Sequence, residues 1–234
     1  MSESLFGYII LAALRKYMFK YQGLTIEKFN HDTIFVRNQH NIYFDPFRVE
    51  MINMPRADMV FISHQHPDHC SPEDLEKVIK SDSLIIASHL CQPLLQRFQQ
   101  EKVFLKPGEG IDYRGVKVLA VPAYNTNKYR APGQFFHPRS EGGLGYLIEI
   151  DNIRLYFAGD TDVIEEMSDF GSIDLAFLPV SGTYVMDEKE AAQAIAKIRP
   201  KVVVPMHYGC VAGELKQAFA LQRLTDLAEI RVLN

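Results

Sequence analysis

The sequence predicts an α/β fold in a single domain that spans residues 1–234. Because 47% of the residues are apolar, a chain of this length can build a large core. Three short strand-like segments follow one another early in the chain, and strand-like segments then alternate with helical ones. A meander followed by strand–helix alternation is typical of sheets that carry helices on their outer faces.

The chain begins with an almost wholly apolar run, Leu5–Leu14, which is followed by Arg15 and Lys16. The run is too short to cross a bilayer, and it lacks the basic start and the cleavage pattern of a signal peptide. We therefore expect a helix over about residues 4–19, within an N-terminal apolar segment 1–20, packed on the domain or on a partner subunit. A helix lying on a membrane surface is the alternative.

The next elements are expected in a regular order. A meander of strands over 24–29, 33–37 and 41–44 precedes a buried strand over 58–63. A helix follows, with Ser71 as its N-cap and Pro72 at its first position. The remaining expected strands are at 84–87, 102–105, 115–121, 174–178, 201–205 and 229–233, with a hairpin of 144–150 and 153–158. Further helices are expected near 93–100, from the capping box at 187–190 to about 198, and at 214–224.

The most informative motif directly follows the buried strand. Residues 64–69 read His64-Gln65-His66-Pro67-Asp68-His69. A tight loop at a strand end can aim several side chains at one point, whereas a helix or a strand would spread them. Imidazole and carboxylate groups are the usual ligands of catalytic zinc and similar ions. The motif therefore indicates a metal site rather than a polar loop that happens to be rich in histidine.

This motif resembles the H-x-H-x-D-H signature of the metallo-β-lactamase superfamily. The resemblance covers about residues 24–210, and it implies a four-layer αββα sandwich with metals at one edge between the sheets. Within the superfamily, the chain is similar to short metal-dependent hydrolases related to the ascorbate-6-phosphate lactonase branch. The other segments that carry the resemblance are Asp45-Pro46-Phe47, Ala158-Gly159-Asp160-Thr161, the stretch 178–187 and Pro205-Met206-His207-Tyr208.

The resemblance also implies a ligand set for two divalent cations. Zinc fits these ligand types best, although manganese, iron, nickel or cobalt would also bind. One cation would be held by three imidazoles, the second by a carboxylate and two imidazoles, and one further carboxylate would lie between them. In that order, the residues are His64, His66 and His137, then Asp68, His69 and His207, then Asp160.

Two of these assignments have alternatives, and two further residues are expected beside the ligands. Asp160 follows a strand and could instead cap the next helix. Asn125 stands where the simplest alignment has a histidine, so it could replace His137 in the first site. Asp45 is expected to support ligand residues through hydrogen bonds, although it could form an ordinary Asp-Pro turn. His31 is expected either in such a supporting role or facing the substrate.

The expected chemistry is hydrolysis by a hydroxide that bridges the two cations. The substrate would be a small ester, lactone or phosphoester. Asp68 and His69 are the candidate catalytic residues, since Asp68 could also orient the water. Related flavin-linked di-iron oxidoreductases generally carry Glu where this chain has His66, which favours hydrolysis.

Two loops are candidates for substrate contacts. The loop 124–140 is basic and aromatic and could recognise a phosphorylated or carboxylated small molecule, or it could be a mobile surface loop or a subunit contact. Hydroxyl groups at 181–184 could line the same pocket. The candidate residues are Asn125, Lys128, Arg130, Ser181, Thr183 and Tyr184.

Composition limits the other possibilities. The net charge of −4 gives no strong signal for nucleic-acid binding. Three cysteines without a C-x-x-C pair favour a reducing, cytoplasmic location. We expect a small-molecule substrate, no transmembrane segment and possible homo-oligomers. The alternatives to a small-molecule hydrolase are a phosphodiesterase or nuclease acting on nucleic acid, and a non-catalytic metal-binding scaffold.

Overall fold

The computed structural model describes residues 18–50 and 54–233, in which two mixed sheets of seven strands pack face to face. In the first sheet the strands follow one another in chain order. The first four are antiparallel and the rest are parallel to β4. They are β1 (Met18–Tyr21), β2 (Leu24–Lys28), β3 (Ile34–Arg37), β4 (Asn41–Phe44), β5 (Met59–Ile62), β6 (Leu84–Ser88) and β7 (Glu101–Leu105).

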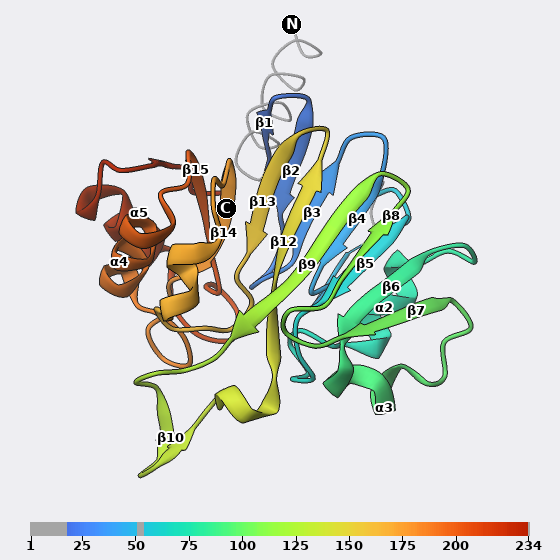
Figure 1. Cartoon of the computed structure of the whole chain (residues 1–234), viewed down its shortest axis with the longest axis horizontal. Helices are drawn as coiled ribbons and strands as arrows, with labels where there is room; N and C mark the ends of the chain where they lie inside the picture. The colour runs from blue at the N-terminus through green and yellow to red at the C-terminus, as the bar shows by residue number, and fades with distance from the viewer. Residues whose placement is uncertain (1–17, 51–53, 234) are drawn as a thin grey trace, which may run out of the picture.

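The second sheet has the order β16-β15-β14-β13-β12-β9-β8, parallel from β13 to β16 and antiparallel from β13 to β8. Its strands are β8 (Gly110–Tyr113), β9 (Val116–Ala123), β12 (Gly143–Ile150), β13 (Ile153–Phe157), β14 (Leu175–Pro179), β15 (Val202–Met206) and β16 (Glu229–Ile230). A separate hairpin of β10 (Tyr129–Ala131) and β11 (Gln134–Phe135) projects away from both sheets (Figure 1).

Helices lie outside the two sheets, so the predicted α/β fold with an αββα order of layers is confirmed (Figure 1). On the side of the first sheet are α2 (Pro72–Val78) and α3 (Gln92–Leu95), and on the side of the second are α4 (Glu188–Ile198) and α5 (Leu215–Leu224). Three short 3₁₀ helices are η1 (His89–Cys91), η2 (Arg139–Glu141) and η3 (Glu165–Asp169). In the described part of the chain, every helix is too short or too polar to cross a membrane.

Alternation along the strands builds two apolar layers. Phe61 points into the core between the sheets, whereas its neighbours Val60 and Ile62 pack in the layer that contains the helices α2 and α3. Phe44 of the first sheet lies 4.8 Å, ring centre to ring centre, from Phe157 of the second. The two sheets therefore share one core.

The N-terminal region differs from the sequence-based prediction. Met18 and Phe19, which were expected to end a helix, belong to β1, which pairs with β2. The connection between the strands is Gln22-Gly23, and both residues have positive φ, as two-residue hairpin turns require. The rest of the predicted helix lies outside the described residues, and a single domain over 1–234 stays a prediction. Strand β8 was also missed, because Gly110 and Asp112 are unfavourable in strands.

Candidate metal centre

Four segments bring the predicted ligands together, and each lies beyond the carboxyl end of a strand. The loop after β5 comes from the first sheet, and the connection from β9 to β12 and the loops after β13 and β15 come from the second. Two groups of side chains place one ligand atom each within 4.8 Å of the others. They are His64, His66 and His137, and then His31, Asp68, His69 and His207.

The first group consists of three imidazoles. The Nδ1 atom of His66 lies 3.0 Å from His64 Nε2 and 3.2 Å from His137 Nε2. Burial lowers the pKa of His137 to about 4, and burial also lowers that of His64 well below its usual value. Both rings are therefore neutral at pH 7, which is the form that binds a cation.

The carboxylate of Asp160 reaches both groups. Its Oδ2 atom lies 3.2 Å from His137 Nε2 and 3.3 Å from His207 Nε2, and its Oδ1 atom lies 3.4 Å from His69 Nε2. Burial alone would raise the pKa of Asp160, but the surrounding imidazoles outweigh burial and hold it well below its usual range. One ionised carboxylate thus stands between two groups of ligands.

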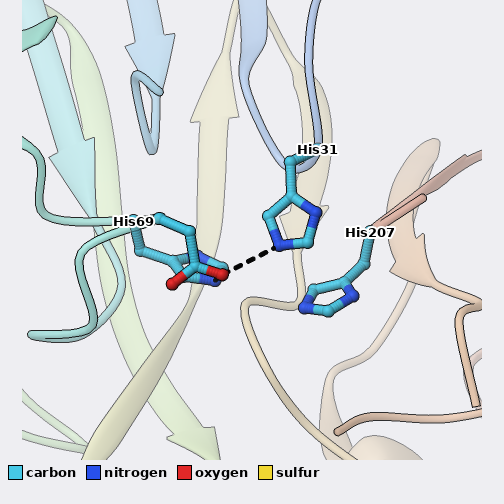
Figure 2. Close-up of side chains that lie close together, drawn as sticks. His31, His69 and His207 are labelled. Atoms are coloured by element: carbon cyan, nitrogen blue, oxygen red, sulfur yellow. Dashed lines mark ion pairs between the residues drawn. The ribbon is translucent and has the colours of Figure 1, made fainter. Parts of the chain in front are cut away.

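The second group includes His31, which the sequence placed only in a supporting or substrate-facing role. His31 Nε2 lies 3.2 Å from Asp68 Oδ2, and the rings of His31 and His207 lie side by side, opposite His69 (Figure 2). Burial opposes ionisation of Asp68, but the neighbouring His31 and His69 lower its pKa to about 2. His31 and His207 both have left-handed backbones, with φ of 53° and 60°, and the His207 N–H donates to the His31 carbonyl.

Asp45 orients the rings of His69 and His64 through hydrogen bonds on the side away from the centre. It contacts His69 directly and His64 through Ser63. It accepts hydrogen bonds from Ser63 N at 2.8 Å, from Ser63 Oγ at 2.6 Å and from His69 Nδ1 at 2.7 Å. The Ser63 hydroxyl in turn lies 2.9 Å from His64 Nδ1. These contacts turn the Nε2 atoms of both rings towards the centre, as carboxylates behind metal-binding histidines do. Ser63 was not predicted, although it directly precedes the motif.

Two other predicted residues also contact ligands. Ser181 Oγ lies 2.9 Å from His207 Nδ1, so this hydroxyl supports a ligand rather than lining a substrate pocket. Asn125 Oδ1 accepts from the backbone N–H of His137 at 2.8 Å and lies 3.1 Å from its Nδ1. The structure therefore places His137 in the first group of candidate ligands, and Asn125 hydrogen-bonds it there.

The remaining substrate candidates lie further from the cluster. The Lys128 amine is 2.6 Å from a Glu190 oxygen, so its charge is already neutralised. Arg130 donates to the carbonyl of Phe136 on the projecting hairpin, and Thr183 is exposed. The Tyr184 carbonyl accepts from Asn125 Nδ2. These residues keep their substrate-contact role only as a prediction.

Sequence analysis also missed Asp32, which sits in the turn between β2 and β3. Burial raises the pKa of its carboxyl group to about 8. Asp32 forms a third candidate group with His69, Asp160 and His207, again with ligand atoms within 4.8 Å of one another. Asn-His-Asp reads as an ordinary turn, so only the pairing of the sheets could reveal this position.

The donor set fits divalent cations. Within residues 18–50 and 54–233, His69 Nε2, His207 Nε2 and Asp160 Oδ1 are buried without a hydrogen-bond partner. Buried polar atoms are normally satisfied, and these three face one another. Imidazole nitrogens and carboxylate oxygens at this spacing are the ligands that zinc and similar ions take.

Known proteins resemble this chain in sequence. The sequence profile of the Beta-lactamase superfamily domain matches residues 25–207. The chain belongs to the metallo-β-lactamase superfamily. A UPF0173 metal-dependent hydrolase from Nanoarchaeum equitans is 31% identical over 188 residues, which cover 79% of this chain and 84% of that protein. The chain therefore also belongs to the UPF0173 metal-dependent hydrolases of this superfamily.

Solved structures agree. The crystal structure of a predicted metal-dependent hydrolase from Parabacteroides distasonis is 33% identical, with a TM-score of 0.78 over 92% of this chain and 96% of that one. Igni18, a metallo hydrolase from Ignicoccus hospitalis, shares the fold at 22% identity, with a TM-score of 0.72 over 90% of this chain and 95% of its own. The predicted metallo-β-lactamase resemblance and the enzyme class, a metal-dependent hydrolase, are confirmed at the level of the family.

Proposed function

We propose that this metallo-β-lactamase family member hydrolyses a small ester, lactone or phosphoester with the help of two divalent cations. The observation that carries the proposal is the position of Asp160, whose two oxygens lie 3.2 Å from His137 and 3.4 Å from His69. A single carboxylate that reaches two groups of ligands is what a bridged pair of cations requires. The metal-dependent hydrolase names of the relatives support the same reaction class.

Zinc is the proposed ion at the first position. When bound, the cations would lower the pKa of a shared water, so that a nucleophile is available at neutral pH. His64, His66 and His137 would hold one cation, and Asp68, His69 and His207 the other. Asp68 is 21% exposed, so it lies on the side of the centre that solvent reaches. From there its carboxylate would accept a proton from the attacking water and orient it.

Four of the chain's own nucleophilic side chains are engaged or buried away from the centre. The hydroxyls of Ser63 and Ser181 are engaged with His64 and His207. Cys70 and Cys91 are buried in the layer between the first sheet and its helices. This arrangement supports water as the nucleophile.

The space beside the first group of ligands favours a small substrate. A small hollow is lined by Gln65, Leu90, Pro138 and Leu144 together with the ligand side chains. The net charge of −4 and the neutralised Lys128 offer little for a nucleic-acid backbone. We therefore rank a small ester, a lactone or a phosphoester, including a lactone of the ascorbate-6-phosphate type, above a nuclease substrate.

The cellular setting is part of the proposal. Cys70, Cys91 and Cys210 are all free, which suits a reducing, cytoplasmic location. Homo-oligomers remain a proposal that sedimentation of the purified protein would check.

Assays of reconstituted protein test this function. Metal-free protein would be loaded with Zn²⁺ or Mn²⁺ and given aryl esters, lactones, phosphomonoesters and phosphodiesters, with single-stranded RNA as the nuclease substrate. Turnover of a small substrate that His66→Ala abolishes is the expected result. Turnover of RNA alone would favour the nuclease. Tight metal binding without turnover of any substrate would favour the non-catalytic scaffold.

A further inference from the structure

Asp32 is a buried carboxylate without a partner. It is 0% exposed, and within residues 18–50 and 54–233 neither of its oxygens has a hydrogen-bond donor. Asp45, which is equally buried, accepts three hydrogen bonds. A carboxylate removed from water without compensation destabilises the fold. Some group that binds anions is therefore expected at Asp32.

The neighbouring cationic groups do not fill this role. His69 Nδ1 is the nearest ionisable nitrogen, at 3.8 Å from Asp32 Oδ2, but its N–H already donates to Asp45 at 2.7 Å. The Lys28 amine is buried on the same strand–turn unit, but it lies over the ring of Tyr208, at 4.0 Å from the ring centre. No described carboxylate, Asp32 included, forms an ion pair with Lys28.

The position of Asp32 points to a cation instead. One of its oxygens and one ligand atom each of His69, Asp160 and His207 lie within 4.8 Å of one another. His69 Nε2, His207 Nε2 and Asp160 Oδ1 are themselves buried without hydrogen-bond partners in the described chain. Asp32 thus belongs to the same buried group of side chains as His69, Asp160 and His207.

We propose that Asp32 is an additional ligand of the second cation and makes the two metal positions chemically unequal. The inference rests on the two-cation site proposed above. The first position offers three imidazoles, whereas the second would offer the carboxylates of Asp32, Asp68 and Asp160 beside two or three imidazoles. Imidazole suits Zn²⁺, and a larger share of carboxylate oxygens suits Mn²⁺. The second position would therefore accept Mn²⁺ more readily than the first position, which offers mainly imidazole.

Manganese binding tests this inference without any assay of turnover. Metal-free full-length protein receives one equivalent of Zn²⁺ and is then titrated with Mn²⁺, while the electron paramagnetic resonance signal of free Mn²⁺ is followed. We expect the wild type to bind about one Mn²⁺ per chain. In Asp32→Asn, which keeps the shape of the side chain, the Kd for Mn²⁺ should rise about tenfold or more. Asp74→Asn is the matched control, because Asp74 is a buried carboxylate that already accepts hydrogen bonds from Arg48 and Val49 and belongs to none of the candidate ligand groups, and it should leave the Kd unchanged.

A second measurement separates ligand loss from misfolding. Without metal, Asp32→Asn should have a Tm at or above that of the wild type, because it replaces a buried carboxyl group that has no hydrogen-bond partner by an amide of the same shape. Its Tm should then rise less than that of the wild type when Mn²⁺ is added. An unchanged Kd for Mn²⁺ in Asp32→Asn would overturn the inference. So would a wild type that binds no Mn²⁺ once the first position holds Zn²⁺.

The outcome is independent of the proposed hydrolysis. A protein that loses Mn²⁺ affinity on Asp32→Asn but hydrolyses nothing would retain this inference and refute the proposed function. Active protein with unchanged Mn²⁺ affinity in the variant would do the reverse.

Discussion

Asn125 Oδ1 lies 3.1 Å from His137 Nδ1 and 2.8 Å from the backbone nitrogen of the same residue. Because an amide oxygen only accepts, Nδ1 must carry the proton and Nε2 must be free to bind a cation. Asn125 also donates through Nδ2 to the carbonyl of Tyr184. A residue that the sequence offered as a competing ligand therefore fixes the tautomer of His137.

Removing this amide should weaken the first metal position. We expect Asn125→Ala to lower Zn²⁺ affinity by about tenfold or more, as loss of a group that hydrogen-bonds a metal ligand usually does. Competition with a chromophoric chelator measures the change. Asn127→Ala is the control, since Asn127 contacts Glu190 away from the centre. If Asn125→Ala binds Zn²⁺ as the wild type does while His137→Ala also does, the third imidazole lies elsewhere.

Loss of the shared carboxylate should reduce metal content. Asp160→Ala removes the only described side chain that lies within 3.5 Å of both ligand groups. We expect bound metal to fall from about two ions per chain to about one or fewer and hydrolysis to stop. Elemental analysis beside circular dichroism measures content and folding. Two ions per folded chain in this variant would show that the assignment of Asp160 is mistaken.

Metal binding at the two positions should depend differently on pH. His64 and His137 have pKa values lowered by burial, so they have no proton to lose near pH 7. Burial alone would also lower the pKa of His69, but Asp160 and Asp45 raise it well above its usual value. A cation must displace the His69 proton, and also the Asp32 proton where Asp32 binds it, so second-position affinity should fall by about tenfold or more per unit as pH decreases towards about 6. First-position affinity should stay nearly constant over this range.

Proton release on titration provides the measurement. Calorimetry in two buffers of different ionisation enthalpy counts the protons released with each ion. We expect release with the second equivalent and almost none with the first. Release confined to the first equivalent would contradict the charge states given for His64, His69 and His137.

Asp45 should stabilise the metal-free fold as well as the centre. Asp45→Asn removes the charge facing the protonated ring of His69, and we expect the free energy of unfolding to fall by about 3 kcal/mol. Urea unfolding of metal-free protein measures this change. Glu149→Gln breaks only the exposed pair with Lys117 and should cost less than about 1 kcal/mol. Equal losses of unfolding free energy in the two variants would show that the buried Asp45–His69 contact stabilises the fold no more than an exposed ion pair does.

Substitutions in the core between the sheets should lower stability without changing metal content. Phe177 is fully buried, with its ring near those of Phe44 and Phe157, so Phe177→Ala should cost about 4 kcal/mol of unfolding free energy. Phe219 is 44% exposed, and Phe219→Ala should change stability by less than about 0.5 kcal/mol. Metal content per folded chain should stay the same in both. A lower content in Phe177→Ala would mean that core packing positions the ligands.

Much of the centre was predictable because its ligands occur in local patterns. His64, His66, Asp68 and His69 lie within one short loop, and Asp160 and His207 each follow an apolar strand. The fold class followed from the same alternation of strands and helices. These features depend on neighbours in the sequence, which is where periodicity and turn chemistry act.

The residues that sequence analysis missed depend on contacts between distant segments. Asp32 and Ser63 gain their roles only when the turn after β2, the strand end after β4 and the His motif meet. Lys128 looked available in the sequence, but folding places it against Glu190 on α4. The helix expected up to Phe19 was wrong at residues 18 and 19, because the Gln22-Gly23 turn folds this segment back onto β2.

The ligands are drawn from both sheets, with His69 early in the chain and His207 late. During synthesis on the ribosome, the His motif emerges long before its partners on the second sheet exist. A nascent chain can therefore offer only a weak, open site, and firm capture of both ions must wait until β15 has been made and docked. Metal binding would then be the last step and would stabilise the folded sandwich. Chains that stall before His207 would remain without a complete centre.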